Sequence, residues 1–503
     1  MGGGPLGSAA IVNRVRCAVQ WVRDPSSGAK QPFHGGSGLP HPQRTPAPRR
    51  KDPSTAQFAA PAQYPTDPLP AFNGDAAITE VLDLALRVGE VLLSSGAASA
   101  DVTKDVLTIT AAYGLPRCEV DITFTAISIS AHRGLSSPPV NTMRVVNYRS
   151  LDYTRLAEVD RVIRSAQTGA LTARQAHGAL DRLTTAPHPY PRWVATLAWS
   201  GMAASIALLV GGGWLVCAVA FGSAVVIDRT KRVLTRTGLP FFFQQVVGGF
   251  IATLPAALLF AAQDALHLSV RPSQVAAAGV IVLLSGLSLV GSMQDAVTGA
   301  MVTAAARFLE VLTLTAGVIV GVGLALKLAS GVGVVLPALG SSSIALSQLP
   351  VQVLAAAGAG AAGFFGLACY AERRALLFAA VAGAAGFAVF GVLQHIAGST
   401  LMASAAAATC VGFAGGVLSR RYRIPPLVIA VSGITPLLPG LAVYRGLFAM
   451  TNSDPVTGLS EMSAAVAIGA ALASGVVLGE WLARSLRSAL RQGVPSLLAV
   501  TKP

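Results

Sequence analysis

The sequence predicts an α-helical membrane protein, in which ten transmembrane helices form two inverted five-helix repeats and follow a small α+β cytoplasmic domain. Three observations lead to this fold class. Of the 503 residues, 53% are hydrophobic and only 12% are charged, whereas soluble domains carry about 25% charged residues. Ten apolar runs follow residue 192, each near the roughly 20 residues that a spanning helix needs. Before them, one segment alternates apolar and polar residues, as a strand does.

Residues 1–72 form a basic tail rich in proline and glycine, of which HPQRTPAPRRKDPS (41–54) is typical. Such a composition cannot bury enough apolar surface to offset chain entropy, so we expect the tail to be disordered. Arg14, Arg16 and Gln20 interrupt its one apolar run, so no signal peptide is expected.

Residues 73–192 are expected to fold as the cytoplasmic α+β domain. Apolar residues recur at helical spacing from Ile78 to Leu92, and the period changes to two further along. The capping box Thr172-x-x-Gln175 predicts the start of a last helix. The expected elements are helices at 78–92, up to 113, around 156–163 and at 172–183, with a strand at 120–124 and its partner strand at 143–148.

An enzyme is one alternative for this domain, since it holds Glu119, Asp121, His132 and His177. No GxSxG, HExxH or phosphate-loop motif accompanies these residues, so a membrane-anchored hydrolase with its chemistry in 73–192 is the weaker hypothesis. The five cysteines are scattered without metal or redox spacing. We therefore expect no metal, no cofactor and no catalytic residues.

The membrane region divides into a first repeat at 193–327 and a second at 350–483, joined by a loop at 328–349 and followed by a cytoplasmic tail at 484–503. Its apolar runs lie at about 193–210, 212–227, 241–261, 274–293, 308–327, 350–369, 374–393, 400–418, 426–443 and 462–482. Arginine and lysine cluster after runs two, six, eight and ten. By the positive-inside rule, both termini are cytoplasmic in a multi-pass plasma-membrane protein. The net charge of +14 lies in these loops and tails, so no nucleic-acid partner is expected.

The stretch Ser285–Glu310, SGLSLVGSMQDAVTGAMVTAAARFLE, carries polar side chains between long apolar runs. A carboxylate near hydrocarbon costs roughly 2.5–3.5 kcal/mol on insertion scales, so Asp295 needs a reason to be there. A glycine-interrupted segment at this depth must be buried in protein or line a watery cavity. An alternative is that Arg307 only marks a helix end. The candidate substrate-binding residues of this stretch are Gln294, Asp295, Thr298, Gly299, Arg307 and Glu310.

The second repeat has a corresponding interruption in ITPLLPGLAVYRG (434–446). Pro439 and Gly440 break the helix, and Tyr444 and Arg445 follow them. A guanidinium fork suits a substrate carboxylate, although tyrosine and arginine also anchor helices at membrane interfaces. Each half has an odd number of spans, so the halves lie upside down relative to each other. Interrupted helices at matched positions are typical of a secondary transporter's site.

At these residues the chain resembles the threonine/serine exporter family, over about 75–485. The resemblance rests on VGSMQDAVTGAMVTAAAR (290–307) and LLPGLAVYRG (437–446). It implies ten spans after a cytoplasmic domain, and export of threonine and serine driven by the proton gradient. The family also has split two-subunit homologues tied to dicarboxylate export, so export of small dicarboxylates is an alternative.

The resulting hypothesis is a proton-coupled exporter, not an enzyme. Asp295 would carry the proton, with Glu310 as a second candidate, and Arg445 or Arg307 would meet the carboxylate. Gln294, Thr298 and Tyr444 would meet the ammonium or hydroxyl group. Expected partners are the small-molecule substrate, protons and the lipid bilayer. The Ala- and Gly-rich helices would also pack closely in lipid, so a homo-oligomer is compatible with the sequence. A non-transporting scaffold or sensor is a further alternative.

Overall fold

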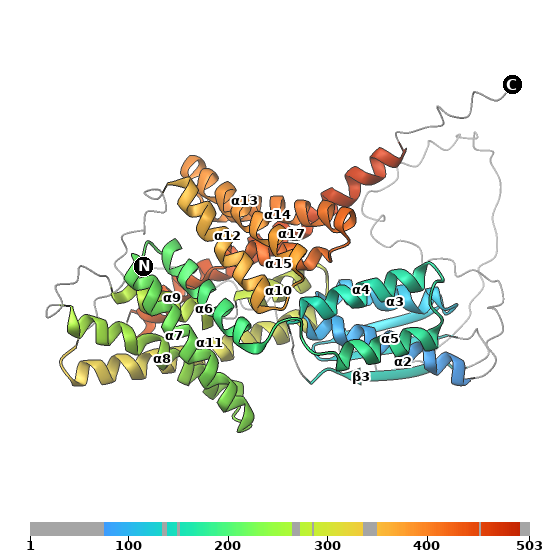
Figure 1. Cartoon of the computed structure of the whole chain (residues 1–503), viewed down its shortest axis with the longest axis horizontal. Coiled ribbons are helices and arrows are strands. Elements are labelled where there is room, and N and C mark those ends of the chain that lie inside the picture. The colour runs from blue at the N-terminus through green and yellow to red at the C-terminus, as the bar shows by residue number, and fades with distance from the viewer. Residues whose placement is uncertain are drawn as a thin grey trace, which may run out of the picture. The chain divides into compact units, whose positions relative to one another are not determined.

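The computed structural model describes residues 75–132, 138–147, 151–263, 272–283, 286–334, 350–451 and 454–492. The tail predicted at 1–72 lies outside these residues, as does most of the predicted loop at 328–349. The described chain consists of an α+β domain followed by a membrane domain built from helices (Figure 1).

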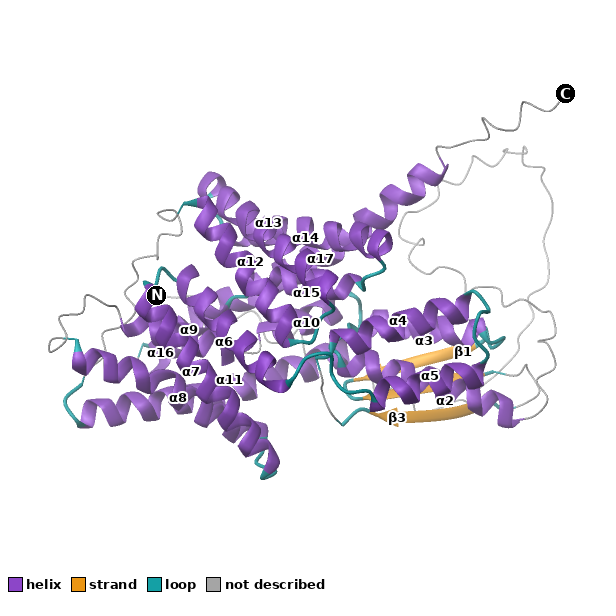
Figure 2. Ribbon diagram, viewed as in Figure 1, coloured by secondary structure: helices purple, strands orange, loops and turns teal. Residues whose placement is uncertain are grey.

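The α+β domain has a three-stranded antiparallel sheet of order β1-β2-β3 (Figure 2). Helices α2 and α3 pack on this sheet, and α4 and α5 pack on these two helices. Every second residue of β3 is exposed, so one face of the sheet is covered by helices. The core contains Leu82, Ile109, Ile127 and Val159, all at most 1% exposed. The elements are α2 (Asp75–Ser94), α3 (Ser99–Ala112), β1 (Cys118–Thr123), β2 (Ala126–Ala131), β3 (Val140–Val145), α4 (Tyr153–Gln167) and α5 (Ala173–Thr185).

Strand β2 corrects the predicted pairing of the strands at 120–124 and 143–148. It lies between them, pairing Ile127 with Ile122 of β1 and Ile129 with Thr142 of β3. The turn from β1 to β2 is tight, with Phe124 at a φ of 55°. No Gly, Pro or Asn marks this turn, and four of the six residues of β2 (AISISA) are alanine or serine. The usual hairpin signals are therefore missing.

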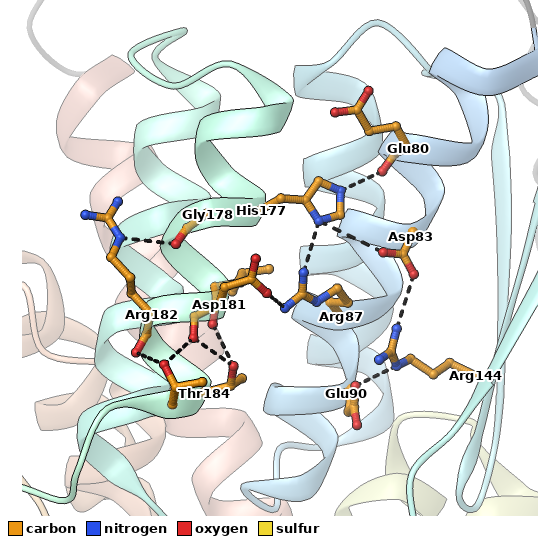
Figure 3. A network of polar contacts seen from close by, with 12 residues as sticks. Glu80, Asp83, Arg87, Glu90, Arg144, His177, Gly178, Asp181, Arg182 and Thr184 are labelled. Atoms are coloured by element: carbon orange, nitrogen blue, oxygen red, sulfur yellow. Dashed lines mark hydrogen bonds and ion pairs between the residues drawn. The ribbon is translucent and has the colours of Figure 1, made fainter.

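A network of ion pairs joins α5 to α2, and α2 to β3 (Figure 3). Arg87 of α2 contacts Asp181 and His177 of α5. Arg144 of β3 lies 2.6 Å from a carboxylate oxygen of Glu90 in α2. His177, one of the residues that raised the enzyme alternative, thus contributes to the packing of these elements. Helix α5 itself begins with the capping box that the sequence predicts.

The membrane domain falls into two sets of helices with similar order. The first set is α6 (Arg192–Leu209), α7 (Trp214–Arg236), α8 (Phe241–Ala262), α9 (Pro272–Leu283), α10 (Gly286–Val297) and α11 (Met301–Gly331). The second set is α12 (Val351–Ala368), α13 (Arg373–Ala397), α14 (Thr400–Tyr422), α15 (Pro426–Ile434) with the 3-10 turn η4 (Thr435–Leu437), α16 (Gly440–Thr451) and α17 (Pro455–Gln492).

In the described part of the chain, seven helices are long and apolar enough to cross a membrane, or up to nine if each of two bent helix pairs is one span. The sequence predicts ten. The remaining helix is α7, whose second half carries Asp228, Arg229, Lys231, Arg232 and Arg236. These charges shorten its apolar part below the length of the other helices.

Both predicted helix interruptions are present. Helices α9 and α10 are bent by 48° at their junction, and α15 with η4 is bent from α16 by 43°. The two bends touch each other, because a Cβ built on Gly286 would lie 3.2 Å from Cβ of Leu438. The breaks therefore meet inside the membrane domain.

Each half is also held by a close crossing of its third and last helices. A Cβ on Gly321 of α11 would overlap the carbonyl oxygen of Val246 in α8. In the second half, a Cβ on Gly475 of α17 would overlap the carbonyl oxygen of Ala405 in α14. Such backbone approach is available only to glycine, as in membrane helix pairs generally.

Candidate substrate site

A cavity of about 440 Å³ lies between the two halves of the membrane domain. Its wall includes the second break, from Thr435 to Pro439, and Ile281 of the first broken pair. Helices α6, α13, α14, α16 and α17 complete the lining. The volume falls in the roughly 300–1,000 Å³ range of small-molecule sites.

Most of the lining is apolar, with phenylalanine, leucine, isoleucine and proline side chains. A few polar groups interrupt it, as in sites that orient small ligands. The polar residues of the lining are Gln394, Thr400, Ser404, Thr435, Arg445 and Glu461.

Three of these residues carry buried polar atoms without a hydrogen-bond partner among the residues that the structure describes. The atoms are Nε of Arg445, Oε1 of Gln394 and Oγ of Ser404. Buried polar groups are almost always hydrogen-bonded, and leaving one unsatisfied costs about 1–3 kcal/mol. A bound polar ligand would satisfy them.

The cavity lies toward the helix ends that are remote from the α+β domain. Helix α6 contributes its last residues, and its first residues follow directly from the α+β domain. Gln394 is near the end of α13, whose preceding residue, Glu372, pairs with Arg161 of α4. Glu461 is near the start of α17. Arg484, toward the other end of this helix, is close enough to Asp101 of α3 for its charge to lower the pKa of that carboxyl. The cavity and the α+β domain thus lie toward opposite ends of these helices.

The structure distributes the predicted second-half residues unequally. Pro439 and Arg445 line the cavity. Gly440 begins α16, and Tyr444, only 3% exposed, packs in a core with Val275 and residues of α8 and α11. Tyr444 therefore joins α16 to the first half and does not line the cavity.

The predicted first-half residues form a separate site beside the α+β domain. Asp295, in the last turn of α10, is fully buried. Its Oδ2 lies 2.7 Å from a guanidinium nitrogen of Arg307, and its Oδ1 accepts a 2.8 Å hydrogen bond from the backbone N–H of Ser99. Arg307 also donates to the carbonyl of Ala97. Asp295 thus supplies the N-terminal capping group that the N-cap residue Ala98 lacks.

Of the other predicted residues of this stretch, Gln294, Thr298 and Gly299 lie at the turn from α10 to α11. The hydroxyl of Thr298 donates to the carbonyl of Gln294 at 2.9 Å. Gly299 adopts a φ of +97°, a conformation that favours glycine. Glu310 is half-buried on α11, one turn beyond Arg307. Gln294, Thr298 and Gly299 thus end α10 before α11 begins, and neither they nor Glu310 line the cavity.

Comparison with known proteins covers both halves. The family model ThrE, whose description is that of a threonine/serine exporter, matches residues 83–329. A second model, described as "Threonine/Serine exporter, ThrE", matches residues 352–482. A "Threonine/serine exporter" of Corynebacterium glutamicum is 43% identical over 86% of this chain and 88% of its own length. A "Probable threonine/serine exporter" of Mycobacterium tuberculosis is 45% identical over 81% of this chain and 77% of its own length.

The chain belongs to the threonine/serine exporter family. Members of this family are transporters rather than enzymes, and the apolar helices make this exporter homologue a multi-pass membrane protein. Neither the hydrolase nor the dicarboxylate alternative is supported by these matches. No solved structure matches the chain.

Five polar residues of the exporter's cavity were not singled out from the sequence: Gln394, Thr400, Ser404, Thr435 and Glu461. Each lies inside a predicted apolar run or within a residue or two of its end. That position was the available signal, since polar groups in transmembrane segments usually face a bundle interior or a cavity. Thr400 is joined to Gln394 by a 3.4 Å hydrogen bond.

The face of α3 that approaches the exporter's membrane domain is acidic. Burial raises the pKa of Asp101, and the charges of Lys104 and Arg484 partly oppose this shift. Burial also raises the pKa of Asp105 to about 6, with Asp101 adding to the effect. These two carboxyls of α3 therefore become protonated at a higher pH than an exposed aspartate does.

Proposed function

We propose that this protein exports threonine and serine through the cavity between its two halves, in exchange for protons. The observation that carries the proposal is the group of unsatisfied atoms on Arg445, Gln394 and Ser404 in the wall of one cavity. The names of the two relatives support the choice of substrate.

The polar groups of the cavity match the parts of a small hydroxy amino acid. The guanidinium of Arg445 would bind the α-carboxylate, for which its fork geometry is suited. The carboxylate of Glu461 would bind the α-ammonium group. Ser404 and Gln394 would hydrogen-bond the side-chain hydroxyl, and the apolar wall, including Phe387 and Phe390, would limit side-chain size.

Glu461 also provides a simple basis for proton coupling. It is the one acid among the described residues that line the cavity. A carboxylate can hold an ammonium group or a proton, but not both, so an arriving proton would release the substrate. The sequence candidate Asp295 is engaged by Arg307 and Ser99, which leaves Glu461 as the better candidate for the exchange.

We further propose ten spans in two inverted repeats, with α7 as the tenth. Helices α6, α7 and α8 begin at Arg192, Trp214 and Phe241, and α12, α13 and α14 begin 159 positions later, at Val351, Arg373 and Thr400. Helices α10 and α11 begin at Gly286 and Met301, and α16 and α17 begin 154 positions later, at Gly440 and Pro455. With five spans in each half, the repeats would be inverted.

The orientation that we propose places the α+β domain and both termini in the cytoplasm. The basic residues in the last turns of α7, α14 and α17 and at the start of α13 favour that side. Glu372, next to the basic pair Arg373-Arg374, contacts the α+β domain. The cavity would then lie toward the outer side of the membrane.

The proposal is tested with purified protein in proteoliposomes, by measuring threonine flux with and without a pH gradient. We expect saturable flux that the gradient accelerates. Arg445→Gln should raise KM by about 10- to 100-fold, the value of a charge-assisted hydrogen bond. Glu461→Gln should abolish the response to the gradient.

Lys327→Gln serves as the matched control, because Lys327 is an exposed cation on α11 outside the cavity. It should transport as the unaltered protein does. Absence of threonine flux in the unaltered protein would refute the proposed function. Unchanged KM in Arg445→Gln would refute the proposed site.

A further inference from the structure

The first half of the membrane domain carries polar groups at the positions that line the cavity in the second half. Counted from the helix starts, Glu461 in α17 corresponds to Arg307 in α11, and Ser404 in α14 corresponds to Gln245 in α8. Oγ of Ser404 and Oε1 of Gln245 are both buried without a hydrogen-bond partner among the described residues. The first half therefore holds a counterpart of the cavity wall, on the side of the α+β domain.

The α+β domain fills this counterpart. Counted from the starts of α6 and α12, Ile206 of the cavity corresponds to Phe365, and Val210 corresponds to Cys369. The ring of Tyr153 from α4 packs edge-on against Phe365, with 6.3 Å between centroids. The backbone N–H of Tyr153 donates to the carbonyl of Cys369 at 2.9 Å. Tyr153 is itself 2% exposed, so it closes this place tightly.

The loop that precedes α3 lies beside the segment that leads into Tyr153, since a Cβ built on Gly96 would lie 3.4 Å from Cδ2 of Leu151. The N–H of Ser99 donates to the carboxylate of Asp295, and the carbonyl of Ala97 accepts from the guanidinium of Arg307. An amino acid would make the same two contacts. Its ammonium group would donate to the carboxylate of Asp295, and its carboxylate would accept from the guanidinium of Arg307. The backbone of Ala97–Ser99 thus stands where a zwitterion would fit.

We propose that Asp295 and Arg307 form a second amino-acid site, on the side of the α+β domain, and that Ala97–Ser99 occupies it as a plug. This inference rests on the proposed function, and it assigns the site from which substrate is loaded. Loading would require the plug to leave, which couples movement of the α+β domain to substrate binding.

Ser99→Pro tests the plug with little disturbance of its helix. Ser99 is the first residue of α3, where proline is well tolerated. The preceding residue, Ala98, has φ −66° and ψ 146°, which suits a residue before proline. The substitution removes the N–H that Asp295 accepts. Ser99→Ala is the matched control, because it keeps this N–H and removes only a hydroxyl without a partner among the described residues.

The readout is the rate at which maleimide labels Cys369 in protein held in lipid nanodiscs. Cys369 is 1% exposed beneath Tyr153, and the other four cysteines are replaced by alanine. Ser99→Pro should be labelled about tenfold faster than Ser99→Ala, as expected for loss of one charge-assisted hydrogen bond. Threonine should accelerate labelling of the Ser99→Ala protein by displacing the plug, whereas glutamate at the same concentration should not.

A second variant, Arg307→Gln, keeps the test decisive if Ser99→Pro does not fold. It should be labelled faster than Ser99→Ala, and threonine should no longer change the rate. Equal labelling of Ser99→Ala and both folded variants would overturn the plug. Faster labelling without any effect of threonine on Ser99→Ala would overturn the amino-acid site. Threonine flux in proteoliposomes is a separate measurement, so failure of the proposed function is distinguishable from failure of this inference.

Discussion

Gly440, the first residue of α16, packs directly on Ile281 of α9. A Cβ built on Gly440 would lie 2.6 Å from Cγ2 of Ile281, closer than real carbon atoms approach. The segment after one break therefore rests against the helix that leads into the other break. A change in the angle between α15 and α16 would therefore shift α9 as well.

Gly440→Val should separate the two broken helices. The added side chain would overlap Ile281, and overpacking of this kind lowers the free energy of unfolding by about 1–3 kcal/mol. Ile281→Ala in the same chain should recover part of the loss, because it removes the atoms that clash. Thermal unfolding in detergent measures both effects, and strictly additive losses would contradict the contact.

The close crossings of α8 with α11 and of α14 with α17 should respond alike to one added methyl group. In Gly321→Ala and Gly475→Ala, the new Cβ meets a backbone carbonyl that cannot rotate away. We expect each variant to lose about 1–3 kcal/mol in free energy of unfolding. Gly222→Ala in α7 is the control, since nothing lies within 4 Å of its Cβ position. A loss in the control equal to the others would show that helix packing is not the cause.

The buried pair of Asp295 and Arg307 should be strongly coupled in stability. Removing one member leaves an uncompensated charge and should cost about 3–5 kcal/mol. We expect Asp295→Asn with Arg307→Gln to lose clearly less than the sum of the single variants. A double-mutant cycle on unfolding free energies provides the measurement. Independent effects would mean that the two side chains do not depend on each other.

The stability of the α+β domain should fall as pH rises from about 4 to 6. Burial raises the pKa of Asp105 from its ordinary 3.8 to about 6, so in this window the folded state binds more protons than the unfolded state. The slope of stability against pH is then negative, and it levels off above pH 6. The difference amounts to at most about 3 kcal/mol.

Asp105→Asn should weaken this dependence, because only Asp101 then contributes of the two, and should be the more stable protein at pH 7.5, whereas the two proteins should be alike near pH 4. Asp121→Asn, at an exposed position of β1, serves as the control for an added amide. Melting temperatures across pH 4–8 test the prediction. Parallel curves for Asp105→Asn and the unaltered protein would exclude Asp105 as the source.

Much of the helix order could be read from the sequence because its signals are local. These signals are the apolar runs, the pair Pro439-Gly440 and the capping box at Thr172. Each of them determines the backbone conformation of residues close to it in sequence. The helix boundaries observed for α6, α8, α12 and α13 differ from the expected ones by only a few residues. Strand β2 was not predicted because the turn before it lacks the Gly, Pro or Asn residues that usually indicate a hairpin.

The partners of the candidate site residues could not be read in this way. The hydrogen bond from Ser99 to Asp295 joins residues 196 positions apart, and nothing near either residue announces it. The polarity of Asp295 was a correct sign that it is buried in protein, but polarity alone does not separate a cavity wall from a contact between domains. Arg445 and Glu461 likewise meet in one wall only through the packing of α16 on α17.

Helix α17 runs without interruption for 38 residues, which is about 57 Å at 1.5 Å per residue. Hydrocarbon about 30 Å thick leaves a large part of it outside the bilayer. A rod of this length acts as a lever, so that a tilt of about 5° moves its far end by about 5 Å. The spacing between Arg484 and Asp101 would therefore report, from the side of the α+β domain, on events around Glu461 near the other end of α17.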